Sequence, residues 1–190
     1  MLNEVAEALK KRGFEAVAVS TKEEALALVM KEVESAASVG WGGSETIKEI
    51  GARQAILDAG REVRDHRTDC DLFLLSANAL TRDGRIVNVD GTGNRVAASV
   101  YGPKRVVYVV GRNKIVDGGI DAAIERVRGC ACPPNARRLG RRTPCGVAGR
   151  CVGGAGCDSP ERMCKVTAIF DRKPTGLSAK VILVDEALGY

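Results

Sequence analysis

Aromatic residues are scarce in this sequence. Phe, Trp and Tyr make up 4% of its 190 residues, so the core must be built from Val, Leu, Ile and Ala. Long apolar runs are also lacking, and no segment reaches the roughly 20 apolar residues that a transmembrane helix needs. The first twelve residues carry Glu4 and Glu7 and lack the apolar centre of a signal peptide. We therefore expect no membrane insertion and a cytoplasmic location, where cysteine thiols stay mostly reduced.

Histidine is almost absent. His66 is the only one, which excludes any metal centre built from two histidines, and its charged neighbours indicate a surface position. The formal net charge is +5, and part of it comes from arginines between residues 137 and 142. Without aromatic stacking residues or a recognisable module, this basic run predicts no nucleic-acid binding. Such a run is usually a solvated face, although its charge could attract an anionic substrate or partner.

The abundant residue is glycine, which occurs 22 times, mostly in short clusters between apolar segments. Apolar residues at helical spacing alternate with short apolar runs. The predicted helices span about residues 2–12, 21–33, 44–57, 95–100 and 120–127. The predicted strands span residues 14–19, 38–41, 62–65, 72–75, 105–110, 165–170 and 180–184, and Asp83-Gly84 predicts a hairpin turn between 79–80 and 86–87. This alternation predicts an α/β fold with a mainly parallel sheet and helices on both faces.

Between Cys130 and Cys164 the apolar periodicity disappears, and Gly, Pro, Arg and Cys dominate. A structureless segment of that length is uncommon in a compact domain unless it is functional or fixed at its ends. We therefore predict a single domain, residues 1–190, with a cysteine-rich loop, residues 130–164, inserted before the last strands.

The first glycine cluster directly follows a predicted strand. Gly42 and Gly43 form a turn, and Ser44 begins the next helix. Backbone N–H groups at a helix N-terminus attract anions, and glycine lets a phosphate or carboxylate approach closely. The spacing matches neither a dinucleotide-binding fingerprint nor a P-loop, which requires a lysine here. The segment therefore predicts either an anion site at Gly42, Gly43 and Ser44 or an ordinary tight turn with a helix cap.

A second polar cluster follows the predicted buried strand at residues 72–75. Its predicted ligand-binding residues are Asn78, Asn88, Gly91, Thr92, Gly93, Asn94 and Arg95. Ligands of open α/β sheets bind beyond the carboxyl ends of the strands, where such a cluster would lie. Asp90 is the best carboxylate candidate for catalytic proton transfer, and Arg95 could pair with an anion. In the alternative interpretation, the asparagines only stabilise turns through bonds to the nearby backbone.

Four cysteines lie in one short segment: Cys145, Cys151, Cys157 and Cys164. Four thiolates suit a tetrahedral zinc ion or an iron–sulfur cluster, because soft metals prefer soft ligands. The pattern lacks a close Cys-x2-Cys pair, and reduced structural cysteines or disulfides are the alternatives. Cys130 and Cys132 are further candidates whose roles the sequence leaves open.

A series of short motifs runs through nearly the whole chain. They are residues 39–44 (VGWGGS), 76–81 (SANALT), 83–84 (DG), 87–97 (VNVDGTGNRVA), 102–104 (GPK), 111–115 (GRNKI), 134–139 (PNARRL), 143–145 (TPC), 159–162 (SPER), 181–184 (VILV) and 188–190 (LGY). In this order they resemble the signatures of the lactate-utilisation (LUD) domain family. The resemblance implies the NagB/RpiA/CoA-transferase-like fold, shared by ribose-phosphate isomerases, glucosamine-phosphate deaminases and CoA transferases.

The resemblance also implies a function. It indicates a protein linked to lactate or a related carboxylate, which binds a small anionic metabolite in a glycine-rich pocket and has redox-complex partners. A non-catalytic binding subunit with a metal-stabilised docking loop is one alternative. A phosphosugar isomerase or CoA-ester enzyme is another, but such isomerases carry an aspartate where this chain has Asn78, and an amide cannot act as a general base. The sequence leaves open whether the protein is an enzyme and whether it forms an oligomer.

Overall fold

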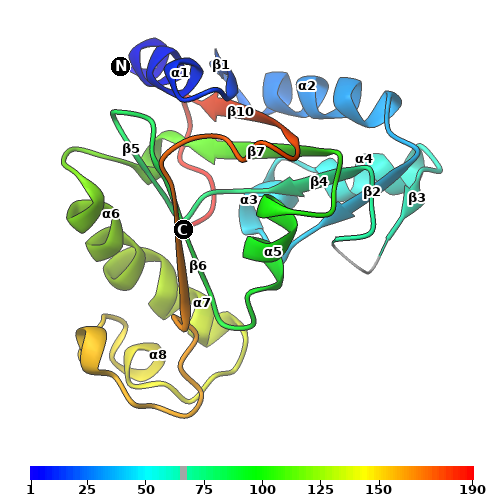
Figure 1. Ribbon diagram of the computed structural model, residues 1–190. Helices are drawn as coiled ribbons and strands as arrows, with labels where there is room; N and C mark the ends of the chain where they lie inside the picture. The colour runs from blue at the N-terminus through cyan, green and yellow to red at the C-terminus, as the bar shows by residue number, and fades with distance from the viewer. Residues whose placement is uncertain (65–67) are drawn as a thin grey trace.

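The computed structural model describes residues 1–64 and 68–190, so the surface position expected for His66 lies outside the described residues. The described part contains two sheets (Figure 1). The larger has six strands in the order β1–β10–β7–β4–β2–β3, and all neighbours are parallel. Its strands are β1 (Glu15–Val19), β2 (Ser38–Trp41), β3 (Glu62–Val63), β4 (Leu72–Leu75), β7 (Arg105–Gly111) and β10 (Ser178–Val184). The α/β fold with a mainly parallel sheet is therefore confirmed.

A second sheet was not predicted. Its four strands follow the order β8–β5–β6–β9. They are β5 (Ala79–Thr81), β6 (Ile86–Asp90), β8 (Ile115–Val116) and β9 (Val166–Phe170). The hairpin predicted at Asp83-Gly84 joins β5 and β6 as an antiparallel pair. Strand β9 lies at the edge of this sheet, with Val166 and Ile169 39% and 42% exposed, whereas its last residue, Phe170, is buried in the core.

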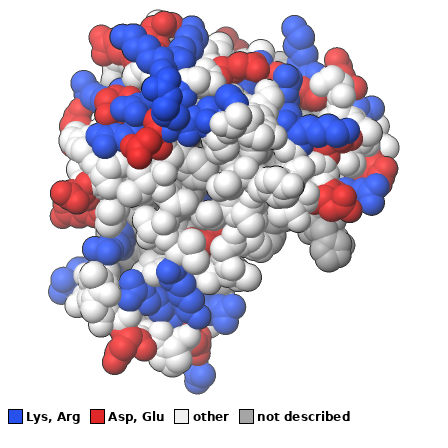
Figure 2. Space-filling model, viewed as in Figure 1, with Lys and Arg blue, Asp and Glu red and all other residues white. Residues whose placement is uncertain are grey.

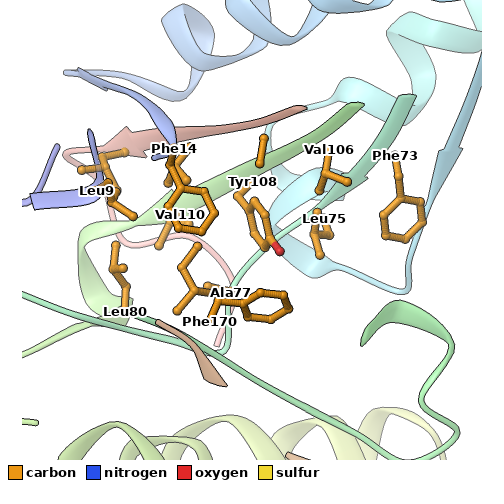
Figure 3. Packing of buried hydrophobic residues seen from close by; sticks show 14 of the residues in the cluster. Leu9, Phe14, Phe73, Leu75, Ala77, Leu80, Val106, Tyr108, Val110 and Phe170 are labelled. Atoms are coloured by element: carbon orange, nitrogen blue, oxygen red, sulfur yellow. The ribbon is translucent and has the colours of Figure 1, made fainter. Parts of the chain in front are cut away.

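Strands of the large sheet alternate their side chains between two hydrophobic clusters. On β7, Val106, Tyr108 and Val110 face one cluster, and Val107 and Val109 face the other. Figure 3 shows the first cluster, between the large sheet and the second sheet. Burial on both faces explains why the central strands read as continuous apolar runs in the sequence.

Helices cover both faces of the large sheet. On one face lie α2 (Lys22–Glu34), α3 (Glu45–Glu49) and α4 (Ala52–Asp58). On the other lie α1 (Leu2–Lys11), α5 (Asn94–Val100) and the second sheet. Gly51 separates α3 from α4 with φ +76, a backbone conformation that favours glycine. No helix in the described ranges is long and apolar enough to cross a membrane.

The prediction that the cysteine-rich segment lacks regular structure is wrong, because part of it is helical. The helix α6 (Ile120–Arg126) continues through a π-helical turn (Val127–Ala131) into α7 (Cys132–Arg138), and α8 (Pro144–Ala148) follows. Pro133 and Pro134 lack backbone N–H groups, and their rings crowd the carbonyls of the preceding turn. The π-turn lies at that point and accommodates them. That residues 130–164 are an insertion in a single domain stays a prediction.

Candidate functional site

A cavity of about 440 Å³ lies at the carboxyl ends of the parallel strands. Its walls come from the segments after β2, β4, β6 and β7, from α7, and from Gly189 and Tyr190. The volume is within the range of small-molecule sites. A Cβ placed on Gly42 would lie 3.7 Å from Cδ of Arg95, so the two glycine clusters adjoin. We call this cavity the anion pocket, for the ligand class predicted from the sequence.

Most of the predicted site residues lie around this pocket. Those that line it are Gly42, Gly43, Ser44, Asn78, Asp90, Gly91, Thr92, Asn94 and Arg95. Asn88 and Gly93 do not line it. Asn88 is buried behind Asn78, and Gly93 precedes α5 with φ +86. Ligand binding by these residues stays a prediction.

Hydrogen bonds fix part of the first glycine turn. The Gly42 amide donates to the Leu74 carbonyl at 3.3 Å, and Ser44 Oγ accepts from the Ile47 amide at 3.3 Å. The helix α3 has only five residues, so its dipole is small. Arg53 on α4 donates to the Gly42 carbonyl at 2.9 Å and thereby fixes the turn. An anion site at the Gly43 and Ser44 amides stays a prediction.

Asp90 and Arg95 form a buried ion pair in the pocket wall, with side chains 7% and 17% exposed. Arg95 Nε and Nη2 donate to Asp90 Oδ1 at 2.9 and 2.6 Å, and the Val96 amide donates to Oδ2 at 2.8 Å. Arg95 Nη2 also donates to Asn78 Oδ1 at 2.6 Å. Both oxygens of Asp90 are thus engaged in holding the wall together. Its role in proton transfer stays a prediction.

Lys114 is the site residue that sequence reasoning missed. It follows β7, its side chain is 3% exposed, and it lines the pocket. Its Nζ donates to Thr46 Oγ1 at 2.7 Å and to Ser76 Oγ at 2.9 Å. Burial, with the nearby charges of Arg126 and Arg95, lowers the pKa of Lys114 to about 7. The one feature of the sequence that marks Lys114 is its position in the GRNKI motif, and this motif does not indicate a chemical role.

The pKa of Lys114 predicts how stability depends on pH. Its folded pKa of about 7 lies below the ordinary 10.5, so the unfolded chain binds more protons between these values. Lys114→Met should therefore stabilise the protein most below pH 7. We expect that gain to shrink from pH 7 to 10.5 by up to about 1.4 kcal/mol per pH unit. Urea unfolding across this range measures it; Lys165→Met, an exposed lysine of the same pocket, is the control. A difference independent of pH would contradict the burial of the charge.

Basic side chains dominate the outer wall of the pocket. Arg138, Arg141, Arg162 and Lys165 line it, against Glu45 and Glu161. Glu45 pairs with Arg138, and Glu161 pairs with Arg142 outside the pocket. Arg141 and Lys165 form no ion pair with a described residue, so positive charge is in excess. Figure 2 shows Lys and Arg gathered at the lower end of the molecule, where Figure 1 places α7 and α8.

A second, smaller cavity lies beside the anion pocket and is lined by cysteines. These are Cys132, Cys145, Cys151, Cys157 and Cys164. Arg162 Nε donates to Cys164 Sγ at 3.2 Å. A hydrogen bond with Cys132, together with Arg162, lowers the pKa of the Cys164 thiol. We call this cavity the cysteine chamber; Cys132, Arg162 and Met163 line both it and the pocket.

All four predicted metal ligands line the chamber, together with Cys132. Cys130 is exposed and does not line it. The four predicted ligands, Cys130 and Cys132 form no disulfide bond among the described residues. Among the described residues, no three Cys, His, Asp or Glu side chains are arranged to hold a single metal ion. Zinc, at about 2.3 Å from each thiolate, would require the sulfurs within about 4 Å of one another. Binding of a metal or a cluster by these cysteines stays a prediction.

The fold and the site define a class: an α/β protein with a basic pocket at the carboxyl ends of a parallel sheet and a thiol-lined chamber beside it. Within that class, the chain belongs to the LUD domain family, whose sequence model matches residues 2–184. The membership inferred from the motifs is confirmed.

A solved structure supports the fold. The chain is similar to a DUF162 family protein from Deinococcus radiodurans, with 18% sequence identity and a TM-score of 0.57. The similarity covers 96% of this chain and 95% of that chain. At this identity it shows the fold alone. A comparison with curated proteins gives no match.

Proposed function

We propose that this protein binds a small carboxylate in the anion pocket and acts in the metabolism of lactate or a related acid. The observation that carries the proposal is the excess of basic side chains around a cavity at the carboxyl ends of the strands. Carboxylates are bound well by guanidinium groups, which donate parallel hydrogen bonds. Family membership supports the link to lactate.

The pocket walls favour an anion of a few carbon atoms. Arg95 is committed to Asp90 and Asn78, and Arg138 donates to Tyr190 Oη at 2.6 Å. Arg141 and Lys165 have no such partner among the described residues, so a ligand carboxylate can supply their counter-charge. The glycine turns, α7 and Lys114 line the same pocket.

The pocket can be tested by isothermal titration with L-lactate, pyruvate and inorganic phosphate. We expect one carboxylate to bind, and Arg141→Gln to weaken its binding about tenfold, because one charged hydrogen bond is lost. The matched control is Arg150→Gln, which removes the same charge from an exposed arginine that lines neither cavity. Equal losses in both variants would indicate general electrostatics and contradict the pocket. Binding of phosphate alone would favour the phosphosugar alternative.

The cysteine chamber is proposed to hold an iron–sulfur cluster. Its ligands would come from Cys145, Cys151, Cys157 and Cys164, with Cys132 as a fifth thiol on the side of the pocket. Such a cluster supplies one-electron transfer. That chemistry agrees with a protein of the cytoplasm that works with redox partners. A chamber that serves only to dock a partner is the alternative, and elemental analysis distinguishes the two.

A further inference from the structure

No described side chain forms an ion pair that would balance a charge on Lys114. The charged groups around it are Arg95 on α5, Arg126 on α6 and Glu49 on α3, and none forms an ion pair with Nζ. The two arginines repel a protonated amine, and burial removes the water that would stabilise it. An amine in such a place either loses its proton or receives an anion.

The hydrogen bonds of Lys114 suit a neutral amine. Thr46 Oγ1 donates its own hydrogen to the Leu188 carbonyl at 3.1 Å, and Ser76 Oγ donates to the Ala77 carbonyl at 3.4 Å. Both hydroxyl oxygens therefore accept from Nζ. A neutral amine has two hydrogens, one for each hydroxyl, and its lone pair is then left for another atom. With a pKa near 7, a large share of the protein holds this form at neutral pH.

The back of this amine is closely packed. Gly189 has φ +59, and a Cβ there would lie 2.6 Å from Thr46 Oγ1 and 3.3 Å from Nζ. The glycine lets the chain pass against the hydroxyl that orients Lys114. Because Lys114 also lines the pocket, its amine is held at the wall where a ligand would lie.

We propose that Lys114 is the nucleophile of the anion pocket and forms an imine with a 2-oxo acid whose carboxylate is bound by the pocket arginines. The inference rests on the proposed carboxylate binding. Nζ attacks the carbonyl carbon, and the carbonyl oxygen leaves as water with the two hydrogens of the amine. The product is a C=N bond, and no oxidant or reductant is needed. A lysine desolvated beside other cations is a recognised way to make such a nucleophile.

Borohydride trapping tests the imine on the wild-type protein. The protein is incubated at pH 7 with pyruvate or glyoxylate and cyanoborohydride, and adducts are located by peptide mass spectrometry. We expect Lys114 to be modified at least tenfold faster than the exposed lysines, which serve as internal controls. Oxalate, an anion without a reactive carbonyl, should slow the reaction at Lys114 only. Adducts spread evenly over the lysines, or an unmodified Lys114, would overturn the inference.

Calorimetry separates this inference from the proposed function. If pyruvate or oxalate binds but Lys114 is not trapped, the carboxylate pocket stands and the imine is wrong. If neither binds and no adduct forms, both fail. The variant Lys114→Gln keeps a donor toward the hydroxyls and should lose the adduct, and its affinity for oxalate is measured beside that of the wild type. Loss of oxalate binding together with the adduct would instead indicate that Lys114 only pairs with the anion.

Discussion

Replacing Cys164 with serine should remove most of the iron and acid-labile sulfide from protein purified without oxygen. A serine oxygen is a poor substitute for a thiolate in a cluster, and Cys164 lies in the chamber beside Arg162. Because ligand binding contributes directly to folding free energy, the melting temperature should fall by on the order of 10 °C. Iron and sulfide assays, visible absorbance and calorimetry measure the three effects.

The chain supplies a close control for this substitution. Cys130→Ser changes an exposed thiol two residues from Cys132 that does not line the chamber, so iron and melting temperature should stay at wild-type values. Repeating the substitution at Cys132, Cys145, Cys151 and Cys157 identifies the thiol that is not a ligand. Wild-type protein with neither iron nor sulfide would refute the cluster, and stoichiometric zinc would restore the single-ion interpretation.

The large sheet could be predicted because its signals are local. The run Leu72 to Leu75 is apolar at every position, and it forms a strand buried on both faces. The hairpin at Asp83-Gly84 follows from the backbone conformation that glycine permits at Gly84. Each of these depends on a few neighbouring residues.

The second sheet and the helix through the cysteine segment were beyond such signals. Strand β9 pairs with β6, about 80 residues earlier in the chain, and its half-exposed residues show no clear alternation. Pro133 and Pro134 usually end a helix, and only the π-turn before them lets α6 run on into α7. Tertiary packing determines both the pairing of β9 with β6 and the continuation of α6 into α7.

The sequence predicted where the site lies, but it predicted only some of the interactions between its residues. Glycine turns after strands point to the edge of a sheet where ligands bind, and the clusters do meet there. The sequence could not reveal that Asp90 pairs with Arg95, or that Lys114 is buried with no carboxylate partner among the described residues. These properties arise from residues brought together by folding, such as Thr46 and Ser76 around Lys114.

Arg95→Met should destabilise the protein by about 3–5 kcal/mol, because it leaves the buried Asp90 carboxylate without its cation. Arg95 also donates to Asn78 and to the Val89 carbonyl at 2.9 Å, so several acceptors lose a partner together. Urea unfolding measures the loss. Arg141→Met, in the same pocket but without an ion pair in the described structure, should change stability by less than about 0.5 kcal/mol.

A double variant shows whether the loss comes from the unpaired charge. Asp90→Asn together with Arg95→Met removes both charges, and we expect it to be more stable than Arg95→Met alone, with a coupling of about 1–3 kcal/mol. The Val96 amide can still donate to the side-chain oxygen that the Asp90→Asn substitution retains, so α5 keeps its anchor. Additive effects of the two substitutions would mean that Asp90 does not depend on Arg95.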